Sequence, residues 1–200
     1  MRWDNLFDDL ESQLEHELTA EEVDLRAEEE RLRLARISLR DRIVTLHEAG
    51  STASVVSNAL RVQLTNGLVV TVHPLSFGRD WFTAELLEES RRPAQCLVPI
   101  SAIAALLLDR RQVQQSLETA SSTGRSLSHR LGLAFALRDL CRRRSSVELL
   151  LGTGVAHGTI DRVGRDHLDL AVHEAGSVRR ETAVSHYRVV PFEQLLLVRM

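Results

Sequence analysis

Four sequence landmarks occur twice in this chain, in the same order and at similar spacing, and this repeat constrains the fold more than any other feature. The pairs are 38–43 with 126–131, 60–64 with 147–151, 78–82 with 164–168, and 97–100 with 189–192. Recurrence of this kind is the sequence signature of a structural unit that is built more than once. The sequence therefore predicts one small unit present in two copies.

Local patterns within the second copy indicate what that unit is. The runs 147–151 and 167–172 are apolar or alternate between apolar and polar residues, as strands do, and Gly164-Arg165-Asp166 has the composition of a turn. The shared Val-Pro step suits a strand edge or a sharp bend, because proline cannot donate a hydrogen bond to a sheet. Each copy is predicted to be a helix followed by about five short strands, which curl into a small barrel.

The predicted fold class is α+β, mainly β, in which an acidic N-terminal helical arm precedes two repeated helix-plus-five-strand small barrels. The segments expected are the arm at 1–37, the first barrel at 38–108, a linker at 109–125, and the second barrel with its leading helix at 126–200.

The barrel pattern resembles the Sm-like and wider SH3-like small barrels. In the second copy the likeness to the first Sm signature is carried by Gly154, Gly158, Ile160, Asp166 and the run 168–170. The asparagine that RNA-binding Sm proteins place after their aspartate is Asp169 here, so the resemblance implies the fold and not the uracil pocket. The whole chain also resembles tandem-barrel proteins of high-GC bacteria, a family that implies no particular activity.

The N-terminal segment has the periodicity of an amphipathic helix. Its apolar residues recur every three or four positions, at Trp3, Leu6, Phe7, Leu10, Leu14 and Leu18. A capping-box pattern at 19–22 either starts a second helix or is passed through by one long helix. The three large residues Trp3, Leu6 and Phe7 are predicted either to cover one of the barrels or to dock in a groove of a protein partner.

The charge is divided between the two ends of the chain. Residues 1–36 contain 12 acidic residues and 5 Arg, a net charge of -7, whereas the remainder has a net charge of +4. Leu133, Phe135, Ala136, Leu137 and Leu140 form an apolar helix face, and four arginines, Arg138, Arg142, Arg143 and Arg144, are expected at the exposed end of this helix. This cluster is either a solvated helix end or a contact for the phosphates of RNA or DNA.

Several kinds of chemistry lack the residues they need. All 25 basic residues other than histidine are Arg, so lysine-based Schiff bases, phosphate loops and general bases are excluded. Cys96 and Cys141 stand alone and are expected to be buried small residues. His167 and Asp169 share a strand face from which Asp166 is expected to point away, so no metal site is predicted there. No cofactor is expected.

The function predicted from these features is a non-enzymatic tandem small-barrel adaptor that binds protein partners. The alternative is a regulatory protein that binds RNA or DNA through its Arg-rich face. The first residues lack the profile of a signal peptide, and no apolar run approaches the ~18 residues that span a bilayer. A cytoplasmic location without membrane contact is therefore expected, and the formation of homo-oligomers is left open.

Overall fold

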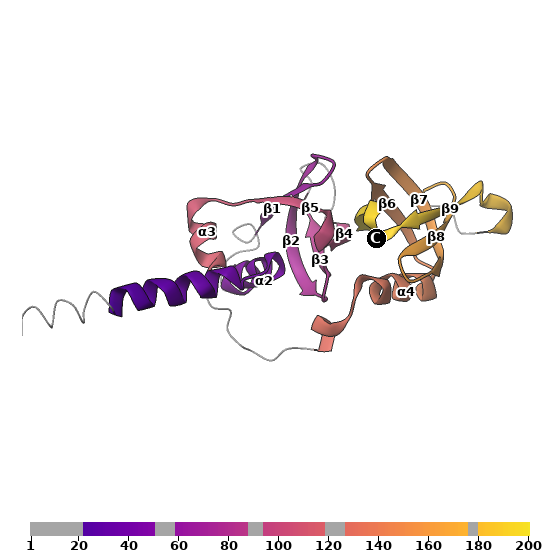
Figure 1. Ribbon diagram of the computed structural model, residues 1–200. Helices are drawn as coiled ribbons and strands as arrows, with labels where there is room; N and C mark the ends of the chain where they lie inside the picture. Colours follow the sequence, from indigo (N-terminus) through magenta and orange to yellow (C-terminus); the bar gives the residue numbers. More distant parts are fainter. Residues whose placement is uncertain (1–21, 51–58, 88–93, 119–126, 176–179) are drawn as a thin grey trace, which may run out of the picture. The chain divides into compact units, whose positions relative to one another are not determined.

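The structure is a computed structural model that describes residues 22–50, 59–87, 94–118, 127–175 and 180–200 (Figure 1). The chain divides into two compact units, Met1–Ser38 and Leu39–Met200, and each is considered by itself. Over the described ranges, no helix has the length and apolar character needed to cross a membrane.

The described part of the first unit is a helix over residues 22–35. Exposed ion pairs join its successive turns, from Arg26 to Glu22 at 3.2 Å and from Arg33 to Glu30 at 2.6 Å. Exposed pairs at this spacing add little to the stability of a helix, because water screens the two charges. The helix lies within the segment predicted to be the acidic arm, while the amphipathic stretch at 3–18 falls outside the described residues.

The second unit contains the described strands. In chain order its elements are α2 (Leu39–Gly50), β1 (Leu60–Leu64), β2 (Val69–Phe77), β3 (Trp81–Leu86), β4 (Ala94–Pro99), η2 (Ile100–Ala102), β5 (Ile103–Leu107), α3 (Arg110–Ser116), η3 (Leu127–Arg130), α4 (Leu133–Arg143), β6 (Ser146–Leu151), β7 (Gly154–Val163), β8 (His167–Val172), η4 (Glu181–Ala183), β9 (His186–Pro191), η5 (Phe192–Gln194) and β10 (Leu195–Arg199).

The strands form one ten-stranded sheet in the order β5-β1-β2-β3-β4-β10-β6-β7-β8-β9. The pairings between the described strands are all antiparallel, as in β1 with β2 and β4 with β10. The predicted class, α+β with mainly strands, is confirmed. The predicted closure into barrels is not, because the sheet is open and ends in two edge strands, β5 and β9.

The two halves of the sheet use the same strand order, since β5-β1-β2-β3-β4 corresponds position by position to β10-β6-β7-β8-β9. Each half contains a Gly-Arg-Asp turn in which the glycine N–H donates to a residue three positions on, Gly78 to Trp81 O and Gly164 to His167 O, both at 2.8 Å. The carbonyl oxygen of Asp80 accepts a hydrogen bond from the N–H of Ile100 at 3.0 Å, and that of Asp166 accepts one from the N–H of Phe192 at 2.8 Å. Ile100 and Phe192 are the residues that follow the two Val-Pro steps.

The two Val-Pro steps also occupy matching positions. Val98 pairs with Phe82 on β3, and Val190 pairs with Leu168 on β8. The side chains of Val98 and Val190 are 0% and 4% exposed. After each proline the chain turns through a short 3-10 helix into the next strand. Both valines are therefore buried at matching positions, and the predicted bend is confirmed.

Register shifts break the pairing at corresponding places in both halves. In β2 the register shifts at Leu75, between Pro74 and Ser76, and in β7 it shifts at Asp161. Each shift lies three residues before the glycine of a Gly-Arg-Asp turn, Gly78 or Gly164. Such bulges bend a strand and increase its local twist.

Two apolar cores fill the unit, and each receives residues from the opposite half. Leu196 and Leu197 of β10 pack into the core that contains Phe82 and α2. Leu97 of β4 and the partly buried Trp81 pack into the core that contains α4. The two halves are therefore joined by shared packing as well as by the hydrogen bonds between β4 and β10.

The helices depart from the prediction in two places. The segment predicted to be a linker begins with helix α3. A capping box between Asp109 and Gln112 closes the N-terminus of this helix. Its Ser116 Oγ accepts two hydrogen bonds from Arg42 of α2, at 3.0 and 2.8 Å. The first of the predicted repeat landmarks also has a different structure at its two occurrences. Residues 39–43 open α2, whereas residues 127–130 form a 3-10 turn and the next helix, α4, begins only at Leu133.

Candidate functional site

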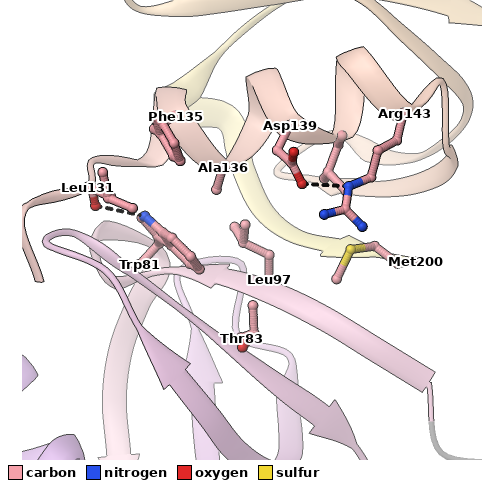
Figure 2. A pocket seen from close by; sticks show the side chains of 10 residues that line it. Trp81, Thr83, Leu97, Leu131, Phe135, Ala136, Asp139, Arg143 and Met200 are labelled. Carbon is pink, nitrogen blue, oxygen red and sulfur yellow. Dashed lines mark hydrogen bonds and ion pairs between the residues drawn. The ribbon is translucent and has the colours of Figure 1, made fainter. Parts of the chain in front are cut away.

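A hollow of about 240 Å³ lies where α4 crosses the strands at the junction of the two halves (Figure 2). It belongs entirely to the second unit. Its walls are mainly apolar, with one ion pair at one end. The lining residues are Trp81, Thr83, Leu97, Leu131, Phe135, Ala136, Asp139, Leu140, Arg143 and Met200.

The wall formed by Trp81 is fixed by the turn that precedes it. The indole Nε1–H donates to Leu131 O at 3.0 Å, and the same oxygen accepts from the backbone N–H of Arg79 at 2.9 Å. A Cβ atom at Gly78 would collide with this indole and with Leu131 O, so the position requires glycine. The turn of the first half thereby holds the segment that leads into α4.

The start of α4 is held by the same turn. Asp80 Oδ1 accepts a hydrogen bond from the backbone N–H of Leu133 at 2.7 Å, and Gly132 at the N-cap supplies no side chain for this purpose. A carboxylate favours a helix N-terminus, where unpaired N–H groups and the helix dipole concentrate positive charge. The orientation of α4 over the hollow therefore depends on a residue of the first half.

Apolar packing holds the rest of α4. Leu133, Leu137 and Leu140 are buried against the strands of the second half. The apolar face predicted for this helix also included Phe135, which does not share the burial of the three leucines. Its side chain is 54% exposed and borders the hollow (Figure 2), because two positions, or about 200° of helical rotation, separate it from both Leu133 and Leu137 and place it on another face of α4.

The polar end of the hollow is an ion-pair cluster. Asp139 binds Arg142 at 2.6 Å and Arg143 at 2.7 Å, and the second of these pairs faces the hollow in Figure 2. The hydrogen bond from Arg142, followed by the charge of Arg143, lowers the pKa of Asp139 below its ordinary value. This carboxylate stays ionised at neutral pH and offsets part of the arginine charge.

Of the predicted Arg cluster, Arg142, Arg143 and Arg144 lie at the exposed C-terminal end of α4, and Arg138 lies in the middle of the helix. Arg138 donates to Gly164 O at 3.1 Å, and Arg142 and Arg143 share Asp139 while 79% and 67% of their side chains remain exposed. Arg144 is the left-handed C-cap of the helix. Of these four residues only Arg143 lines the hollow. The predicted docking residues Trp3, Leu6 and Phe7 lie outside the described residues.

The histidines and aspartates of the second half do not converge on one point. Asp166 does not point away from His167 as predicted, because Asp166 Oδ1 and His167 Nδ1 are 2.8 Å apart. His173 instead pairs with Thr159 Oγ1 at 2.9 Å. Within the described part of the chain, no group of three His, Cys, Asp or Glu side chains could hold a metal ion.

The hollow could not be predicted from the sequence, because its walls come from segments far apart in the chain, such as Trp81 and Leu131. The sequence contains one sign of the hollow, at the residue that follows each Gly-Arg-Asp turn. This residue is Trp81 after the first turn and the smaller His167 after the second. A large aromatic side chain at only one of two matching positions indicates a contact that only one copy makes.

Comparison with known proteins found no matching protein-family model, no matching curated protein and no matching solved structure.

Proposed function

We propose that this chain is a non-enzymatic adaptor, made of two small β units of the Sm-like or SH3-like kind, that binds a protein partner in the cytoplasm. The tandem arrangement is supported by the matching strand orders, the matching Gly-Arg-Asp turns and the matching Val-Pro bends.

The observation that carries the proposal is the exposed apolar lining of the hollow at the junction. Phe135 is 54% exposed and Met200 is 40% exposed, and both border a hollow with apolar walls. Residues of this kind are enriched at the centre of protein interfaces, where an anchor from one partner fills a pocket of the other.

The size of the hollow favours a side chain over a free small molecule. Sites for small molecules usually enclose about 300–1,000 Å³, more than is present here. An apolar cavity of about 150 Å³ already accommodates benzene. The hollow, at about 240 Å³, therefore suits one large apolar side chain presented by a partner. The Arg143 and Asp139 pair at its end offers a polar contact to the partner's neighbouring residues.

Selection of peptides on the full-length chain tests the proposal. The selected peptides should share one bulky apolar residue, and Phe135→Asp should weaken their binding by about 10-fold to 30-fold, as the loss of an interface anchor does. Val155→Asp is the matched control, because Val155 is 51% exposed and lies outside the lining of the hollow. A selection without a common anchor, or equal loss in both variants, would contradict the proposal.

A second candidate function is binding of RNA or DNA through Arg138, Arg142, Arg143 and Arg144. One observation favours it. Asp139 is shared by two arginines whose side chains remain mostly exposed, so the end of α4 keeps a net positive charge. Clustered guanidinium groups suit bidentate contacts with phosphates.

A further inference from the structure

Three lining residues of the hollow stand in a row along α4. Phe135, Asp139 and Arg143 follow one another at intervals of four residues, and all three line the hollow. Residues four positions apart lie one above the other on a helix, about 6 Å apart along its axis. An apolar contact at Phe135 and a charged contact at Arg143 are therefore offered on the same face of the helix, at the two ends of the row.

The ion pair with Asp139 determines where the charge of Arg143 lies. Arg143 Nε contacts Asp139 Oδ2 at 2.7 Å, so the guanidinium is drawn back along the helix toward Phe135. The contact uses Nε, and Figure 2 shows the two terminal nitrogens directed past Asp139 into the hollow. A guanidinium that presents two nitrogens in this way suits the two oxygens of one carboxylate. Asp139 is also paired with Arg142, so the cluster keeps a net positive charge for an incoming anion.

The polar side chains of the wall formed by β3 already have partners. The hydroxyl of Thr83 pairs with Ser76 Oγ at 2.6 Å. The indole N–H of Trp81 donates to Leu131 O at 3.0 Å. Much of the remaining lining consists of apolar side chains such as Leu97. A ligand that fits this lining has one large apolar group and one carboxylate close to it.

The short distance between the two contacts distinguishes a chain end from an acidic side chain. The α-carboxylate of a C-terminal residue is bonded to the same Cα atom as its side chain, so both groups belong to one residue. In an extended peptide the side chain of the next residue points to the opposite face, and that of the residue after it lies roughly 7 Å further along. Because Asp139 draws Arg143 back to within about one turn of Phe135, the carboxylate of the anchor residue itself fits the shorter separation.

We propose that the hollow binds the C-terminal residue of the partner protein. This site rests on the adaptor function and specifies its ligand. The bulky apolar side chain of the last residue lies against Trp81, Leu97 and Phe135, and its α-carboxylate accepts two hydrogen bonds from the terminal nitrogens of Arg143. The hollow, at about 240 Å³, has room for one such side chain. The partner is therefore a protein that ends in a large apolar residue with a free carboxylate.

Peptides with free C-termini test the proposal on the full-length chain. A peptide library displayed with its C-termini free should yield ligands that end in a bulky apolar residue. The best ligand is then synthesised as the free acid and as the C-terminal amide, and the binding of both is measured by fluorescence anisotropy. The amide should bind about 10-fold more weakly, because it lacks the charge-assisted hydrogen bonds to Arg143.

Two arginine variants show whether Arg143 binds the carboxylate. In Arg143→Gln the acid and the amide should bind with nearly equal affinity. Arg162→Gln is the matched control, because Arg162 is also exposed and paired with an aspartate, Asp169, but does not line the hollow. In this control the full difference between acid and amide should persist. The melting temperature of each variant confirms that it is folded.

The outcomes separate the C-terminal site from the adaptor function. If the ligands share an internal apolar anchor, and Phe135→Asp weakens their binding while amidation does not, the adaptor function stands and the C-terminal site is overturned. The same conclusion follows if Arg143→Gln keeps the full difference between acid and amide. If the selection yields no apolar anchor and Phe135→Asp does not change binding, the adaptor function fails, and the C-terminal site fails with it.

Discussion

At the scale of single residues, a few side chains make hydrogen bonds to residues far away in the sequence. Asp80 reaches from a turn of the first half to the first turn of α4, and Trp81 bonds to Leu131 O in the segment before that helix. Gly78 is required at the same turn because the Trp81 indole occupies the space of a side chain. The sequence indicated the turn, but it gave no sign of the partners that these residues find about 50 positions away.

The lowered pKa of His47 predicts how the stability of the fold depends on pH. Burial, followed by the charge of His73, lowers the pKa of His47 below its ordinary value of 6.5, although Glu48 and a hydrogen bond with the backbone of Pro74 oppose the shift. The unfolded chain therefore takes up a proton at a pH where the folded chain does not. The stability due to neutral His47 is complete above pH 6.5 and is lost as the pH falls through the folded-state pKa.

Thermal melts at about pH 7.5 and about pH 5.5 measure this effect. The melting temperature should fall on acidification, and His47→Gln, which cannot titrate, should reduce that fall. Equal acid sensitivity in the native chain and in His47→Gln would show that His47 does not contribute.

At the scale of elements, the sequence was most informative where the signal is local. The strands at 147–151 and 167–172, the turn at Gly164 and the bends at the Val-Pro steps were predicted, because alternation and turn chemistry act over a few residues. Helix α3 was missed although Asp109-Arg110-Arg111-Gln112 contains its capping box. The pairing of β4 with β10 could not be predicted, since any two edge strands of suitable composition satisfy the same local pattern.

The two Val-Pro bends give a prediction for these elements. Val98→Ala and Val190→Ala each remove packed methyl groups from a buried site and should reduce the free energy of unfolding by about 1–3 kcal/mol. Val155→Ala, at a position that is 51% exposed, should change it by less than about 0.5 kcal/mol. Chemical denaturation measures all three variants. If Val98→Ala and Val190→Ala both have the free energy of unfolding of the native chain, the burial of the two valines does not stabilise the fold.

At the scale of the whole molecule, the opposed charges of the arm and the body separate the two candidate functions. If α4 binds nucleic acid, replacing Arg142, Arg143 and Arg144 with Gln should weaken binding to all sequences. It should also flatten the salt dependence, by up to about one unit of slope for each lost phosphate contact. Deletion of residues 1–36 removes a net charge of -7 and should strengthen the same binding.

Fluorescence anisotropy with mixed RNA and DNA at several salt concentrations follows both changes. The two variants must shift the affinity in opposite directions. If neither the native chain nor the deletion variant binds at low salt, the nucleic-acid function is excluded and the protein-binding function remains.

The most direct test of the adaptor function is photo-cross-linking in cells from position 135, with a photoreactive phenylalanine analogue in place of Phe135. The adducts are identified by mass spectrometry with and without nuclease treatment. The adaptor function predicts a defined protein adduct that survives nuclease and is absent when the analogue replaces Val155, which lies outside the hollow. Adducts that contain only nucleic acid, or the same proteins captured from both positions, would contradict it.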